Sequence, residues 1–111
     1  LLHAAGVPLL VGTDSPEPYC PPGAALHQEM ELMVESGLTP AAVLQAATIN
    51  NARALKQVDR LGSVTAGKLA DLVILEADPT ADIRNSRKIV RVIRGGIQCD
   101  PATVLQSVPA K

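Results

Sequence analysis

The chain of 111 residues is 47% hydrophobic and 19% charged, which places it among folded globular proteins and suits one small domain. Ten basic residues against eleven acidic ones leave a formal charge of −1, and there is one Tyr, no Phe and no Trp, so neither a basic surface nor stacking groups for nucleic acid are expected. No apolar run approaches the ~18 residues that a membrane span requires.

The first six residues are typical of the last turn of a helix that is closed by Gly6. Because the sequence opens at the end of a helix, we expect it to be a fragment of a longer protein. Residues 7–12 then form a short apolar run, Val-Pro-Leu-Leu-Val-Gly, without polar alternation. Such a run predicts a strand that is buried on both faces, as in a parallel sheet.

The run ends at Asp14, which lies between the hydroxyl residues Thr13 and Ser15. Four prolines within residues 16–22 exclude a helix or a central strand after it and predict a stiff loop. A buried strand would therefore deliver one carboxylate to its C-terminal edge, where α/β sheets and barrels build their active sites. The alternative is an ordinary Asp that begins a loop.

Two helical segments are expected next. Helical spacing of apolar residues predicts a helix over residues 24–36 that ends at Gly37, with Glu29 and Glu35 facing away from the apolar side. Thr39 and Pro40 are typical of the first positions of a second helix. The Thr-Ile-Asn-Asn stretch at 48–51 is expected to interrupt that helix, and Asn50 to cap a short one over residues 51–56.

From residue 61 onward the pattern changes to short strands. We expect strands at residues 63–65, 72–75, 88–94 and 97–99, a helical turn at 82–85, a hairpin turn at Gly95-Gly96 and a weak helix from Asp100. The strand over residues 72–75 is predicted to be buried. Gly67 is expected to adopt a positive φ, and Asp71 to accept hydrogen bonds from local backbone N–H groups. These strands are too few to close a sheet, so edges would stay open.

Four motifs in this order resemble the C-terminal part of the amidohydrolase superfamily of metal-dependent hydrolases, in its imidazolonepropionase-like and prolidase-like branch. They are Gly-Thr-Asp-Ser at 12–15, Leu-His-Gln-Glu-Met-Glu-Leu at 26–32 with Gly-Leu-Thr-Pro at 37–40, Ala-Ala-Thr-Ile-Asn-Asn-Ala-Arg-Ala-Leu at 46–55, and Gly-Ser-Val at 62–64 with Gly-Lys-Leu-Ala-Asp-Leu-Val-Ile-Leu at 67–75. Together they cover almost the whole chain.

The resemblance implies an α/β fold, with a C-terminal piece of a (β/α)₈ TIM-like barrel beside part of a small β-sandwich. Residues 1–60 would supply the last barrel strand and its closing helices. Residues 61–111 would supply the C-terminal strands of the sandwich. The chain would then require the remainder of the barrel as a partner, and it would act in a cytoplasmic homo-oligomer.

The same resemblance implies a role for Asp14, which matches the family Asp after the eighth strand. That Asp ligates or lies beside a divalent metal, one or two zinc ions, and accepts the proton of the attacking water. The substrate would be a small amide, cyclic amide or dipeptide whose C–N bond is cleaved. Because the other family ligands come from earlier strands, the fragment alone is expected to be inactive and to bind no metal.

Three further residues are candidates for substrate contact, namely Ser15, Cys20 and His27. His27 lies one helical turn from Glu31, so a pair on the helix surface is the favoured interpretation. His3 lies at a helix end and is not expected to be a ligand. Cys20 and Cys99 lack metal-ligand spacing, which favours free thiols, although one disulfide between them stays possible.

Two other classes of function are compatible with the sequence. One is a non-catalytic module that packs and assembles through its β-strands. The other is a redox protein that uses Cys20 and Cys99. Metal content and a His-x-His strand upstream would distinguish the hydrolase from the assembly module.

Overall fold

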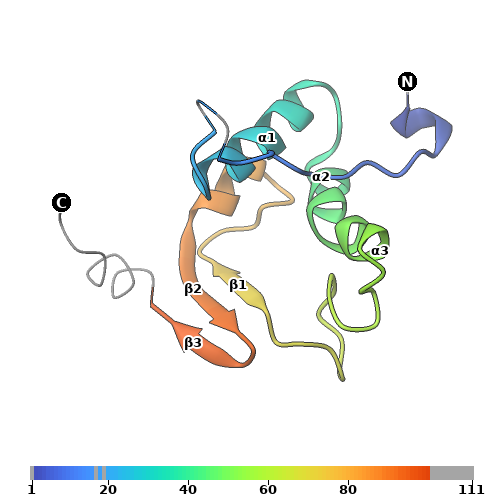
Figure 1. Cartoon of the computed structure of the whole chain (residues 1–111). Helices are drawn as coiled ribbons and strands as arrows, with labels where there is room; N and C mark the ends of the chain where they lie inside the picture. The colour runs from blue at the N-terminus through green and yellow to red at the C-terminus, as the bar shows by residue number, and fades with distance from the viewer. Residues whose placement is uncertain (1, 17, 19, 101–111) are drawn as a thin grey trace.

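A computed structural model describes residues 2–16, 18 and 20–100 of the chain (Figure 1). Helices gather on one side of the molecule and a small antiparallel sheet lies on the other. None of the helices in the described part of the chain has both the length and the apolar character needed to cross a membrane. The elements in chain order are η1 (His3–Ala5), α1 (Ala24–Glu35), α2 (Pro40–Gln45), η2 (Ala46–Asn50), α3 (Asn51–Ala54), β1 (Leu72–Leu75), η3 (Ile83–Arg87), β2 (Ile89–Arg94) and β3 (Ile97–Cys99).

The sheet has the order β1-β2-β3, and both pairings are antiparallel. The predicted hairpin is confirmed, because Gly95 and Gly96 both have positive φ, 56° and 82°, and join β2 to β3. Asp71 Oδ1 accepts a hydrogen bond of 2.7 Å from the Gly95 N–H. This contact corrects the expectation that Asp71 serves local backbone, since the strand pairing brings the distant hairpin turn to it.

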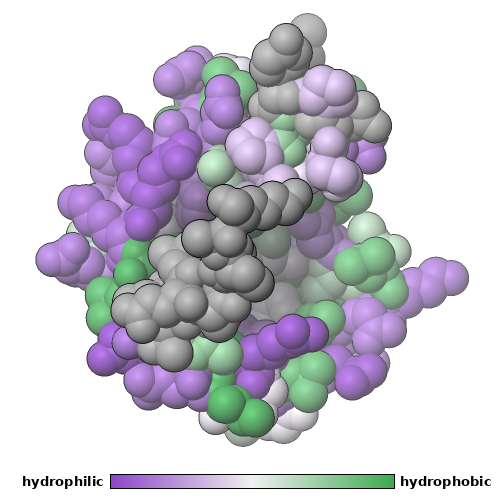
Figure 2. All heavy atoms as spheres, turned by 60° about the vertical axis from the view of Figure 1, so that its left-hand side comes forward, coloured by the Kyte–Doolittle hydropathy of each residue, from purple (hydrophilic) through white to green (hydrophobic). Residues whose placement is uncertain are grey.

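Two expectations about the strands are wrong. Residues 63–65 form no strand. Strand β1 is not buried on both faces, because Val73 and Ile74 are 56% and 45% exposed. The physical reason is that the three short strands have no second sheet among the described residues to cover them. Figure 2 turns the sheet side forward and shows apolar side chains there among hydrophilic ones.

The helix boundaries follow local signals. Helix α1 ends where predicted, and Gly37 beyond it has a φ of 100°. Thr39 caps α2, since its side chain accepts a hydrogen bond from the Ala42 N–H, and Pro40 occupies the first turn. The predicted helical turn near Asp82 is present as η3, which Asp82 caps through the Arg84 N–H.

The break predicted at Asn50 does not occur. Helix α2 continues through the π-turn η2 into α3, and Asn50 keeps helical angles of φ −70° and ψ −41° without capping α3. Its side chain is engaged elsewhere, because Asn50 Nδ2 donates to the Leu9 carbonyl oxygen at 3.1 Å. A tertiary partner has therefore replaced the local cap. Helix α3 also ends at Ala54, earlier than expected.

Residues 7–12 are extended but form no strand in the described structure. Val7 and Leu10 are 42% and 48% exposed, so the prediction of a strand buried on both faces is wrong for this chain. A strand needs neighbours, and no described residues pair with this segment through a backbone ladder. The helical turn before this segment ends as expected, since Gly6 closes η1 in the left-handed conformation.

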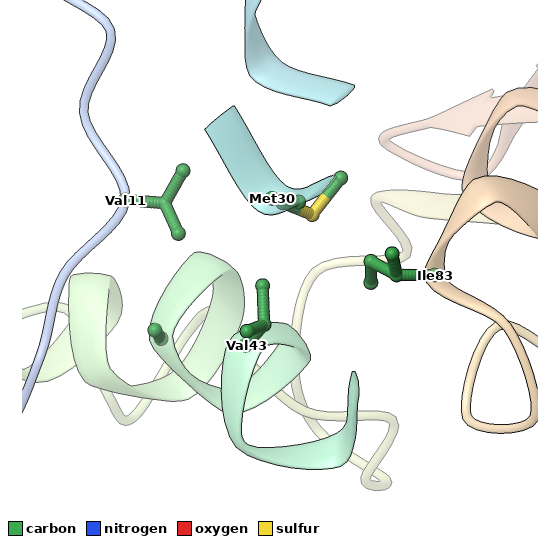
Figure 3. Close-up of a cluster of buried hydrophobic side chains, with 5 residues drawn as sticks. Val11, Met30, Val43 and Ile83 are labelled. Atoms are coloured by element: carbon green, nitrogen blue, oxygen red, sulfur yellow. The ribbon is translucent and has the colours of Figure 1, made fainter. Parts of the chain in front are cut away.

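The hydrophobic core joins this extended segment to the helices and to η3 (Figure 3). Val11 from the segment, Met30 from α1, Val43 from α2 and Ile83 from η3 are each no more than 6% exposed and belong to one cluster. Val11 therefore anchors the segment three residues before Asp14. The weak helix expected from Asp100 falls on residues 101–111, outside the described residues.

Candidate active site

Asp14 lies exposed at the end of the extended segment. Its φ of 52° is in the left-handed region, which an Asp tolerates better than most side chains but which still costs energy. Such conformations cluster at functional sites, where the surrounding structure enforces them. Asp14 is therefore a candidate for chemistry on its backbone geometry as well as on its position in the sequence.

The loop after Asp14 is closed by its own side chains. Ser15 Oγ donates to the Cys20 carbonyl oxygen at 2.8 Å, and Cys20 Sγ donates to the Thr13 carbonyl oxygen at 3.4 Å. Both side chains are half-buried, and both cysteines of the chain are free thiols, as predicted. The structure thus brings Ser15 and Cys20 together with Asp14, and it uses their polar atoms to fold the loop.

Three helical side chains hold the backbone of the extended segment. Asn50 Nδ2 donates to the Leu9 carbonyl oxygen at 3.1 Å, and Asn51 Nδ2 donates to the Val11 carbonyl oxygen at 2.9 Å. On α1, Glu29 Oε1 accepts a hydrogen bond of 3.0 Å from the Gly12 N–H. Side chains therefore supply the partners that neighbouring strands would give to a strand.

Sequence reasoning missed all three of these contacts. Glu29 was expected to face away from the apolar side of its helix, yet it contacts the segment that leads to Asp14. Its second oxygen, Oε2, is buried and has no hydrogen-bond partner in the part of the chain that the structure describes. The sequence held one signal for the contacts of Asn50 and Asn51. Consecutive asparagines inside a helix are unfavourable unless their side-chain amides form hydrogen bonds.

His27 lies apart from this group. Its Nδ1 forms a hydrogen bond of 2.9 Å with Ser86 Oγ, and Glu31 Oε1 instead accepts from Arg87 Nε at 2.6 Å. The expected pair of His27 with Glu31 is therefore replaced by two links from α1 to η3. Partial burial, and then the positive charge of Arg87, lower the pKa of His27, while the charge of Glu31 opposes them.

The described residues do not by themselves form a metal centre. No group of three or more His, Cys, Asp or Glu side chains among them is placed to hold an ion. A catalytic zinc site normally uses three protein ligands and one water. The exposed carboxylate of Asp14 is of a type that can serve as one ligand of a divalent cation.

Comparison with known proteins places these features in a family. The model of the amidohydrolase family matches residues 1–98. The chain belongs to the amidohydrolase family. It resembles the imidazolonepropionase of Aromatoleum aromaticum (strain DSM 19018 / LMG 30748 / EbN1), with 39% identity over 87 residues, which cover 74% of this chain and 20% of that protein.

Solved structures place the chain in the same branch of amidohydrolases. Molinate hydrolase superposes with a TM-score of 0.80 and 34% identity, covering 97% of this chain and 28% of the hydrolase. A Xaa-Pro dipeptidase, solved with methionine bound in its active site, has a TM-score of 0.65 and 35% identity, covering 68% of this chain and 18% of the dipeptidase. The chain thus spans less than a third of each of these three proteins.

Proposed function

We propose that this chain acts as the C-terminal part of a metal-dependent amidohydrolase that cleaves a C–N bond in a small amide, cyclic amide or dipeptide. Asp14 is the observation that carries the proposal, because an exposed carboxylate sits in left-handed backbone at the end of an anchored segment. The names of the relatives, imidazolonepropionase and Xaa-Pro dipeptidase, support this class of bond and of substrate.

The proposed architecture divides the chain near residue 60. Residues 1–60 would contribute the last strand and closing helices of a (β/α)₈ barrel, and residues 61–111 would contribute strands to a small β-sandwich. Two observations support the division. The segment before Asp14 has its backbone bonded by helical side chains, and the sheet leaves the apolar residues Val73 and Ile74 exposed. The rest of the barrel would supply strands beside the segment before Asp14, and the other part of the sandwich would cover the sheet.

Asp14 would act as the base and then as the acid of the reaction. A divalent cation, when bound, supplies a water whose pKa is lowered toward ~7. The Asp14 carboxylate would hold that ion or lie beside it, accept a proton from the attacking water and deliver the proton to the leaving nitrogen. Ser15 and Cys20 would fix the loop that carries Asp14, since their side chains bond to backbone oxygens within it.

The Asp14→Asn variant of the complete enzyme tests this proposal. We expect it to keep its fold, measured by circular dichroism, and to lose on the order of 10³-fold in kcat, because Asn cannot accept the proton. Asp59→Asn is the matched control, since Asp59 is an exposed Asp outside the loop, and it should keep the parent activity. The 111-residue chain alone should hydrolyse none of the substrates. Near-normal turnover by Asp14→Asn would refute the assignment.

A further inference from the structure

The contact between Glu29 and Gly12 links α1 to the segment that carries Asp14. Glu29 Oε1 accepts the Gly12 N–H at 3.0 Å across 17 residues of sequence. Met30, the next residue of α1, is 4% exposed and belongs to the same core cluster as Val11, the residue before Gly12. Residues next to both partners of the hydrogen bond are therefore packed in the same core, which holds α1 and the extended segment side by side.

The carboxylate is costly to keep where it lies. Its Oε2 atom is buried without a hydrogen-bond partner among the described residues, and a buried acceptor that lacks a donor destabilises a protein. Packing alone gives no reason for a charged group at this position. Among the described residues, the carboxylate bonds to the Gly12 N–H, two residues before Asp14. Its position is therefore explained by that backbone group.

We propose that Glu29 is a positioning residue for Asp14, an inference that rests on the function proposed above. Asp14 has a φ of 52°, in a narrow region of backbone conformation. Rotation of the Val11–Gly12 peptide unit would change the direction in which the chain enters Asp14 and so move the carboxylate away from the reacting atoms. The Glu29 oxygen accepts the N–H of this peptide unit, and Asn51 donates to its Val11 carbonyl oxygen, so both of its polar groups are held. An acceptor atom at this place is what the role requires, and a negative charge is not.

Three substitutions of Glu29 in the complete enzyme separate the effect of side-chain length from the effect of negative charge. Glu29→Gln keeps an acceptor oxygen and loses the charge, whereas Glu29→Asp keeps the charge but is one methylene too short. Glu29→Ala loses both. We expect kcat to fall about 10- to 100-fold in the Asp and Ala variants, with KM and bound metal within about twofold of the parent, because misplacement by about 1 Å can cost that much in rate. Glu29→Gln should retain kcat within about threefold.

A control variant and a second readout complete the test, and the second readout does not depend on activity. Glu35→Ala removes an exposed carboxylate from the same helix and should leave kcat unchanged. Hydrogen–deuterium exchange of the peptide that contains Gly12 should be faster than in the parent for the Asp and Ala variants, and unchanged for Gln and for Glu35→Ala. Exchange therefore reports the bond itself even where a variant is inactive.

Three results would overturn the inference. The first is parent-like kcat in Glu29→Asp or Glu29→Ala together with faster exchange at Gly12, since the bond would then be dispensable. The second is loss of kcat in Glu29→Gln with retention in Glu29→Asp, which would assign the role to the charge. The third is unchanged exchange in all variants. Full activity of Asp14→Asn would instead refute the proposed function, whatever Glu29 does.

Discussion

Two extended parts of this molecule satisfy their backbone groups in opposite ways. In the sheet, β1, β2 and β3 pair backbone to backbone, as in Val73 with Val92, and the register shifts once, between Ile74 and Leu75. In residues 9–12, the carbonyls of Leu9 and Val11 and the N–H of Gly12 bond to side chains from α1, η2 and α3.

The difference determines what each part tolerates. A backbone ladder is indifferent to most side chains on its exposed face, so single substitutions there should cost little. The segment before Asp14 depends on particular amide and carboxylate groups, and their removal leaves backbone atoms unpaired. We therefore expect sensitivity to mutation to be concentrated around Asp14 and in the helices that hold it.

The largest effect on stability should come from Gly62, which packs against the helical turn that carries Asn50 and Asn51. Its φ is +87°, and a Cβ there would lie 2.7 Å from Ala52 Cβ and 2.9 Å from Ile49 Cα. Gly62→Ala should lower the free energy of unfolding by about 2–5 kcal/mol, from left-handed strain and overpacking together. Gly67 has a similar φ of +89°, as predicted, with nothing within 4 Å of a Cβ, so Gly67→Ala should cost only about 1–2 kcal/mol. Equal losses in urea unfolding would contradict this view of Gly62.

A direct contrast between the two extended parts comes from Asn51 and Gln98. Asn51→Ala leaves the Val11 carbonyl without its donor and should cost about 1–3 kcal/mol. Gln98→Ala alters an exposed side chain on β3 and leaves the ladder intact, so its effect should stay within about 0.5 kcal/mol. Unfolding of both variants in urea measures the contrast, and similar losses for the two would remove the distinction drawn here.

The smallest effect should be a pH dependence at the link between α1 and η3. Because burial and Arg87 lower the pKa of His27 below its ordinary 6.5 against the opposing charge of Glu31, the unfolded chain binds the proton more readily. Stability from His27 is thus complete above pH 6.5 and declines as the pH falls below it, through the folded pKa. His27→Gln should abolish this decline between pH 8 and 5, measured as the difference in unfolding midpoints. A decline of equal size in the variant would assign it to other groups.

The sequence predicts best those elements whose causes are local. The Thr39 cap with Pro40 behind it, the end of α1 near Gly37 and the Gly95-Gly96 hairpin each depend on the conformational preferences of one to three adjacent residues. Such preferences can be identified without knowing what lies nearby. Asp14 is proposed for a similar reason, because an apolar run followed by an isolated Asp marks the end of an extended segment, and its catalytic role stays a prediction.

The remaining features depend on partners that are distant in the sequence. Asn50 has the local chemistry of a cap, but the Leu9 carbonyl lies 41 residues away in the sequence and takes its amide. Helical spacing assigns Glu29 to a polar face without revealing that Gly12 lies beside that face. The apolar run at 7–12 indicates a buried strand, yet burial requires neighbours that the described residues do not provide. Spacing alone cannot supply any of these contacts.

The π-turn η2 also makes the length of this helix part of the site. Successive residues of an α-helix point about 100° apart, whereas a π-turn holds one extra residue and shifts the phase of everything beyond it. In this chain the shift falls over Ala46–Asn50, just before Asn51. Deleting a single residue there would restore a plain α-helix and rotate Asn51 away from Val11. The number of residues in this turn therefore matters as much as the Asn50 amide and the buried Ala46 within it.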